Sequence, residues 1–150
     1  MTPQHPPALC ASVEVAVPAR AAFDFMADGL KQTHWALGSW NRRELDDGVF
    51  VGTSRFNYEE LYVRLEAHPE LLLVDYHGSS DPDDLRWIVQ ARIVPGDQLG
   101  IGEQRSLVTL TTWRHATASD EEWDLTYHLW HTEVALIRGR LEYEAALTAR

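Results

Sequence analysis

The stretch SDEEWDLTYHLWHTEVALIRGRLEYEAALTAR, residues 119–150, decides the fold of this chain. Ser119 followed three residues later by Glu122 forms a capping box, which marks the start of a helix. Apolar residues then recur at spacings of four and three, the period of one helix face: Trp123, Tyr127, Trp130, Val134, Ile137 and Leu141. The stretch therefore predicts one long amphipathic helix whose apolar face needs an apolar partner.

The residues before this helix supply that partner, because most of them carry strand signals. A strand over residues 12–17 and a short helix over residues 19–28 come first. Alternating apolar residues and turn signals then predict six further strands, over residues 40–45, 49–56, 61–66, 71–76, 85–94 and 107–115. Asp46, Asp47 and Gly48 favour a tight hairpin turn between the first two of these. This order predicts an α+β helix-grip fold, in which a curved antiparallel β-sheet wraps around the long C-terminal helix.

Length and cysteine content bound the class of protein. With 150 residues the chain suits one domain, and we expect residues 1–10 to form a flexible N-terminal tail and residues 11–150 to form the domain. The single cysteine, Cys10, cannot form a disulfide within the chain. No stretch has the continuous apolar length of a membrane span. We therefore expect a cytoplasmic protein without membrane insertion.

The charge balance bears on partners. The chain has 13 basic and 23 acidic residues, a net charge of −10, and such a field repels phosphate backbones. We expect no nucleic acid partner. The nearest approach to a basic run is Arg42 and Arg43, and a solvated face is the expected place for both.

The opening of the chain resembles that of a known family. Residues 13–19, VEVAVPA, run into residues 22–28, AFDFMAD, and Trp35 follows. A strand, a proline, a helix with paired aromatic residues and a following tryptophan, with the long helix at the other end, resemble the START/Bet v 1-like (SRPBCC) superfamily and its polyketide cyclase/dehydrase-like members. The resemblance covers residues 11–147. It implies a helix-grip fold with a hydrophobic cavity between the concave face of the sheet and the long helix.

Large aromatic side chains and a few histidines are the candidate ligand contacts. Rings with polar tips can line a pocket for a flat or lipid-like ligand. The candidate ligand-binding residues are Trp35, Tyr76, His77, Trp87, Trp113, Tyr127, Trp130 and His131. In the alternative interpretation, the same rings fill the core and leave little cavity.

A metal site is a weaker hypothesis. His128 and His131 are three residues apart on the predicted helix, but the helical period turns His128 well away from the apolar stripe. The same period puts His131 on one flank of the stripe and Glu133 on the opposite flank. Metal sites need three or four converging ligands, so we expect no metal and no cofactor. The sequence also lacks a nucleophile elbow and a glycine-rich phosphate loop.

Three functions remain open at this point. The first is a soluble binding protein for a hydrophobic or aromatic small molecule, lipid- or polyketide-like, held in the cavity. The resemblance also implies a cyclase, aromatase or dehydratase, with His131, His77 or Tyr76 as acid or base. The third is a protein-interaction module without a pocket.

The oligomeric state stays open as well. Leu129, Leu136 and Leu147 form a second apolar line on the long helix. This line either packs within the chain or forms a homodimer contact.

Overall fold

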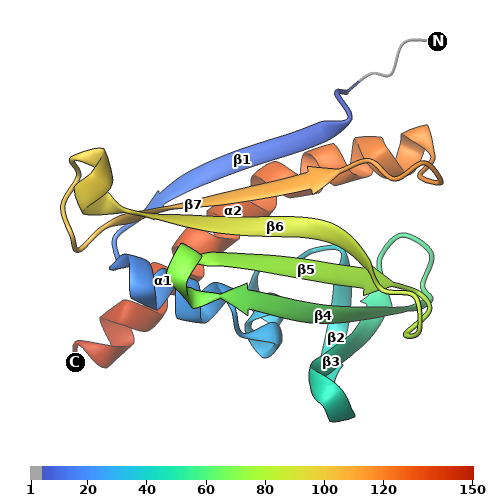
Figure 1. Cartoon of the computed structure of the whole chain (residues 1–150), viewed down its shortest axis with the longest axis horizontal. Helices are drawn as coiled ribbons and strands as arrows, with labels where there is room; N and C mark the ends of the chain where they lie inside the picture. The colour runs from blue at the N-terminus through green and yellow to red at the C-terminus, as the bar shows by residue number, and fades with distance from the viewer. Residues whose placement is uncertain (1–4) are drawn as a thin grey trace.

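The sheet confirms the predicted fold class. The computed structural model describes residues 5–150, which form one seven-stranded antiparallel sheet in the order β1-β7-β6-β5-β4-β3-β2 (Figure 1). The strands are β1 (Ala8–Val15), β2 (Ser39–Glu44), β3 (Val49–Ser54), β4 (Glu60–His68), β5 (Leu73–Ser79), β6 (Arg86–Pro95) and β7 (Ser106–Trp113). Each strand from β2 to β6 pairs with the next one along the chain, and β1 pairs with β7 and forms one edge of the sheet.

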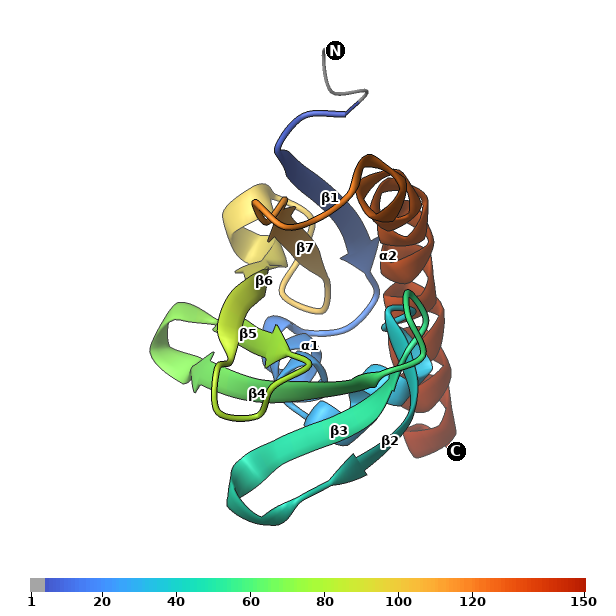
Figure 2. The ribbon, with the colours of Figure 1, turned by 90° about the vertical axis from the view of Figure 1, so that its right-hand side faces the viewer.

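Two α-helices complete the fold. The short helix α1 (Ala19–Met26) follows β1, and the 29-residue α2 (Asp120–Thr148) ends the chain. The 3₁₀ segments are η1 (Gly29–His34), η2 (Asp46–Gly48), η3 (Pro69–Leu71) and η4 (Gly96–Leu99). Figure 2 shows the strands from β1 to β2 tracing an arc, with α1 inside it and α2 along its open side. None of the described helices combines the length and the apolar character needed to cross a membrane.

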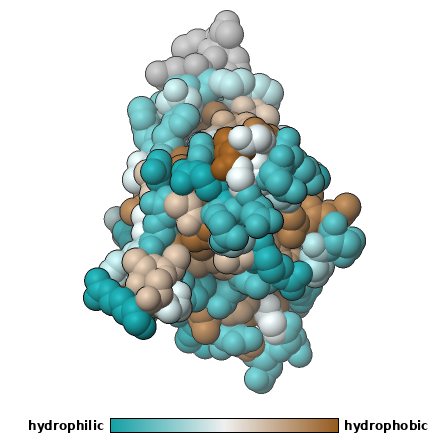
Figure 3. Space-filling view, turned by 90° about the vertical axis from the view of Figure 1, so that its left-hand side faces the viewer, coloured by the Kyte–Doolittle hydropathy of each residue, from teal (hydrophilic) through white to brown (hydrophobic). Residues whose placement is uncertain are grey.

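The core lies between α2 and the concave face of the sheet. The buried residues of α2 include five apolar side chains, Trp123, Trp130, Val134, Ile137 and Leu141. They meet buried side chains that point inward from the strands, among them Val15, Val74 and Leu110. From the side that carries η4 and the C-terminal end of α2, the surface is mostly hydrophilic, with small hydrophobic patches (Figure 3). The apolar stripe of α2 therefore packs against the sheet of the same chain, as the sequence predicted.

The capping box at the start of α2 is present as predicted. The Ser119 hydroxyl accepts a hydrogen bond from the backbone N–H of Glu122 at 3.1 Å. The Glu122 carboxylate in turn accepts one from the backbone N–H of Ser119 at 3.0 Å. Both N–H groups would otherwise lack a partner at the helix end.

We expect Ser119→Ala to lower the free energy of unfolding by about 1 kcal/mol, because it removes the acceptor for the N–H of Glu122. Urea denaturation of the two proteins measures the difference. Thr132→Ala is the matched control, since the Thr132 hydroxyl only bonds back to the carbonyl of His128 within the helix. A loss as large in the control as in Ser119→Ala would contradict a specific role for the cap.

The start of the chain differs from the expected tail. Strand β1 begins at Ala8, and residues 5–7 are also held by contacts. The His5 ring lies 2.8 Å from the Asp124 carboxylate, and the carbonyl of Pro6 accepts a hydrogen bond from the indole N–H of Trp123. The early start of β1 was not predicted because it depends on pairing with β7, where Ala8 lies opposite Trp113, far along the chain. Residues 1–4 of the predicted tail lie outside the described residues.

Candidate ligand-binding cavity

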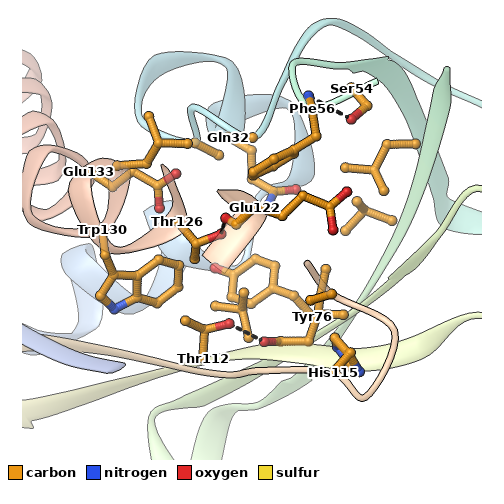
Figure 4. Close-up of a pocket in the computed structure, with 18 of the residues that line it drawn as sticks. Gln32, Ser54, Phe56, Tyr76, Thr112, His115, Glu122, Thr126, Trp130 and Glu133 are labelled. Carbon is orange, nitrogen blue, oxygen red and sulfur yellow. Dashed lines mark hydrogen bonds between the residues drawn. The ribbon is translucent and has the colours of Figure 1, made fainter. Parts of the chain in front are cut away.

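A cavity of about 250 Å³ lies between α2 and the concave face of the sheet. Its walls are mostly apolar and come from η1, the strands β2–β7 and α2, with the loops beside them. Figure 4 shows Trp130 and Glu133 projecting from α2 on one side, with Tyr76 and Thr112 on the facing sheet. The chain therefore does not fill its core completely, although aromatic rings form much of the wall.

The cavity continues toward the N-terminal end of α2. A second hollow of about 270 Å³ is lined there by Asn57, Glu60 and Ser80, which the cavity does not touch. The two spaces share five wall residues, namely Ser54, Phe56, Leu61, Glu122 and Thr126. We call this shared region the mouth of the cavity.

Three polar groups of the inner wall form hydrogen bonds to backbone carbonyls. The Trp130 indole N–H donates to the carbonyl of Leu110 at 3.1 Å. The Tyr76 hydroxyl donates to the carbonyl of Met26, and the Thr112 hydroxyl donates to the carbonyl of Ile88. Because these bonds use the polar atoms, the groups facing the cavity are largely carbon.

Glu133 is the buried carboxyl of the wall. This residue is only 5% exposed. One of its carboxyl oxygens accepts a hydrogen bond from the backbone N–H of Leu37 at 2.8 Å. Burial raises the pKa of Glu133 to about 7, although the Leu37 hydrogen bond and the positive charge of Arg42 both act to lower it. This carboxyl therefore titrates near neutral pH.

Arg42 brings a positive charge to the same cavity. Burial lowers the pKa of its guanidinium to about 10, while Glu133 and Tyr76 oppose that shift. Within residues 5–150 no hydrogen bond or ion pair holds this side chain, and its Nε atom is buried without a partner. Three further buried polar atoms of the wall lack a partner in the described residues: Gln32 Oε1, Trp35 Nε1 and His115 Nε2.

A β-bulge explains why Arg42 points inward. Trp40 pairs with Thr53 and Arg43 pairs with Val51, so β2 has one more residue than β3 over this stretch. Asn41 takes up the irregularity with a φ of 56°, in the left-handed region. Such a bulge redirects the side chains beside it. The expectation that Arg42 lies on a solvated face is therefore wrong, whereas Arg43 is exposed.

Four of the predicted ligand-binding residues line the cavity, namely Trp35, Tyr76, Trp113 and Trp130. The other four, His77, Trp87, Tyr127 and His131, do not line it. Trp87 donates a hydrogen bond to Asp75 and contacts the Trp113 ring at 4.2 Å between centroids, and His77 lies 3.4 Å from Glu66. The pairing of β5 with β6 shifts register between Tyr76 and His77.

Tyr127 and His131 lie on the flank of α2. The Tyr127 ring stacks on His5, with 4.0 Å between the ring centroids and 4° between the planes. His131 packs edge-on against Tyr127 and is exposed. His5 therefore covers the Tyr127 ring, which the helical period alone predicts to face the cavity.

The polar residues of the wall were missed by the sequence analysis. Glu133 carried a detectable signal, because it lies three residues after Trp130 and four before Ile137, both on the apolar stripe. A carboxyl at that spacing belongs on the buried face. Arg42 and Gln32 carried no comparable signal, since a bulge and a 3₁₀ segment respectively set their directions.

No protein-family model matches the sequence, and no curated protein matches it. Solved structures do match. The chain is similar to the Zhui aromatase/cyclase from Streptomyces sp. R1128, with a TM-score of 0.68 and 15% identity, covering 92% of this chain and 94% of that one. It is also similar to a START superfamily protein from Mycobacterium smegmatis, with a TM-score of 0.61 and 14% identity, covering 91% of this chain and 97% of that one.

A third similar structure is the Aha1 dimer from Colwellia psychrerythraea, with a TM-score of 0.61 and 11% identity, covering 90% of this chain and 96% of that one. Likenesses at this level of identity establish the fold and no activity. The seven-stranded curved sheet, the long C-terminal helix and these similar structures together show that the chain has the helix-grip fold of the START/Bet v 1-like (SRPBCC) superfamily.

Proposed function

We propose that this protein binds a small, mostly apolar or aromatic molecule in the cavity between the sheet and α2. The observation that carries the proposal is the cavity itself, about 250 Å³ with a mostly apolar wall. An apolar protein cavity of about 150 Å³ accommodates benzene, so this one has room for a ligand of one or two rings. Burial of apolar ligand surface, at about 25 cal/mol per Å², supplies the main driving force.

The catalytic alternative has less support from the residues that suggested it. His77 and His131 are outside the cavity. Tyr76 lines it, but its hydroxyl is already donated to Met26, and burial raises the pKa of that hydroxyl well above its ordinary value. Binding therefore remains the proposed function. The homodimer also remains a prediction, and its candidate contact is the exposed line of Leu136 and Leu147 on α2.

Filling the mouth of the cavity tests the proposal. Leu61 of β4 is half-buried and lines both the cavity and its mouth. We expect Leu61→Trp to weaken binding of 2-naphthol at least tenfold, because the larger ring occupies the space that the probe needs. Titration calorimetry measures the affinity.

The neighbouring residue provides the control. Tyr62 points to the opposite face of the sheet, because successive side chains of a strand alternate, so Tyr62→Trp adds a similar ring outside the cavity and should leave the affinity unchanged. Thermal denaturation establishes that both variants fold. A folded Leu61→Trp protein that binds 2-naphthol as tightly as the wild type, or a wild type that does not bind it, would contradict the proposal.

A further inference from the structure

Two ionisable side chains line the cavity without forming an ion pair with each other. Arg42 comes from the edge strand β2, and Glu133 comes from the middle of α2. No nitrogen of Arg42 lies within 4.0 Å of the Glu133 carboxyl. Among the described wall residues, Arg42 is the one arginine or lysine. Both side chains are therefore available to a polar group of a ligand in the cavity.

The Arg42 guanidinium has no partner among the described residues, and its Nε atom is buried, although the residue as a whole is half-buried. Withdrawing a charge from water without a partner is unfavourable, and a suitable anion offsets that cost. The planar guanidinium matches a carboxylate better than any other common anion except phosphate, because it can donate two parallel hydrogen bonds. The indole N–H of Trp35, which is 2% exposed, is a further buried donor without a partner.

Cavity size favours the carboxylate over a phosphate group. The volume of about 250 Å³ leaves little room for a bulky dianion beside an apolar body of one or two rings. The wall also carries two carboxyl groups, Glu133 and Glu122, which disfavour a doubly charged ligand. A single negative charge is the most that one guanidinium can balance.

We propose that the ligand of this cavity is a small aromatic or aliphatic monocarboxylic acid, whose carboxylate pairs with Arg42 and accepts a hydrogen bond from protonated Glu133. This inference rests on the proposed function and adds to it the head group of the ligand. The apolar body of the acid lies against the rings of Trp130 and Trp113. In this complex the bulge at Asn41 orients the Arg42 side chain toward the ligand.

The protonation of Glu133 makes binding depend on pH. The pKa of about 7 means that this carboxyl takes up a proton near neutral pH at little cost. Besides Arg42, the titratable groups on the surrounding wall are Tyr76 of β5, Glu122 at the start of α2 and His115 after β7. The bound carboxylate favours the protonated form of Glu133, so each ligand bound above pH 7 brings about one proton with it.

The experiment compares three probes with one ring system: 2-naphthoate, 2-naphthol and 2-methylnaphthalene. Calorimetry at about pH 6 and about pH 8.5, in buffers of different ionisation enthalpy, gives both the affinity and the number of protons taken up. For the wild type we expect 2-naphthoate to bind at least tenfold more tightly than 2-methylnaphthalene at the lower pH. From a pKa of about 7, its affinity should fall about thirtyfold at the higher pH, with proton uptake.

Variants assign the effect to its residues. Arg42→Gln should remove the preference for 2-naphthoate and keep the binding of 2-methylnaphthalene. The adjacent Arg43→Gln is the matched control and should behave as the wild type, since Arg43 is exposed. Glu133→Gln keeps a neutral hydrogen-bond donor, so 2-naphthoate should bind it almost equally at both pH values and without proton uptake.

The outcomes separate this inference from the proposed function. If 2-methylnaphthalene and 2-naphthol bind but 2-naphthoate is not preferred, the head-group inference fails and the proposed function stands. If 2-naphthol is the tightest ligand and its affinity rises with pH, the head group is a neutral hydroxyl that donates to ionised Glu133, and the carboxylate is overturned. If none of the probes binds, both fail.

Discussion

Trp130→Ala is expected to lower the free energy of unfolding by about 3–5 kcal/mol. The Trp130 ring is 5% exposed and packs between α2 and the sheet, so its removal leaves a space next to an existing cavity. It also removes the indole hydrogen bond to the carbonyl of Leu110, which adds about 1 kcal/mol to the cost. Urea denaturation followed by far-UV circular dichroism measures the change.

A control on the same helix separates this effect from a loss of helix propensity. Leu125 is 41% exposed, so Leu125→Ala should cost less than about 1 kcal/mol. Trp130→Phe restores most of the ring but no indole N–H, and should fall between the wild type and Trp130→Ala. Equal losses for Trp130→Ala and Leu125→Ala would mean that Trp130 does not connect α2 to the sheet.

Glu133→Gln is expected to stabilise the ligand-free protein above pH 7 and to change its stability little at pH 5. Burial raises the pKa of this carboxyl from 4.5 to about 7, so the unfolded chain loses the proton at a lower pH than the folded protein does. The stability contributed by the protonated carboxyl is complete below about pH 4.5 and is lost as the pH rises to 7. At about 1.4 kcal/mol per pKa unit, the loss approaches roughly 3 kcal/mol.

Glutamine avoids this loss because it has no proton to release, and its carbonyl can still accept the hydrogen bond from Leu37. Thermal and urea denaturation of both proteins between about pH 5 and about pH 8.5 should show a difference that grows with pH. Glu121→Gln, on the exposed first turn of α2, is the control and should give a small difference that does not vary over this range. A Glu133→Gln difference that is the same at every pH would show that Glu133 does not titrate in this interval.

Patterns among residues close together in the sequence were sufficient to predict the helices and strands of the fold. The capping box of Ser119 and Glu122 and the apolar stripe of α2 are relations between residues three or four apart, which a helix brings together wherever it lies. The strands were predicted in the same way, because alternation within a strand does not depend on its neighbours. The ends of the strands were predicted less accurately. The strand predicted to begin at residue 71 begins at Leu73, because Leu72 takes a left-handed conformation that ends η3.

The candidate site was predicted less completely. Trp35, Tyr76, Trp113 and Trp130 were found because large aromatic side chains mark the inner faces of the sheet and helix. His77, Trp87, Tyr127 and His131 are outside the cavity. Two of them are strand residues next to a wall residue in the sequence: His77 follows Tyr76, and Trp87 precedes Ile88. The register shift at Ile88 turns Trp87 outward and His5 covers Tyr127, and neither leaves a local pattern. His77 follows the inward-facing Tyr76 and therefore lies on the other face of the strand.

The sequence by itself determined the order of the elements, the length and start of α2, and the apolar faces that α2 and the strands turn toward each other. Only the tertiary structure decided which polar groups face the cavity. A bulge in β2 aims Arg42 inward, and the packing of α2 encloses Glu133. The physical reason is that the period of a helix or strand fixes relative directions within one element, whereas burial and pKa depend on what the other elements place around a side chain.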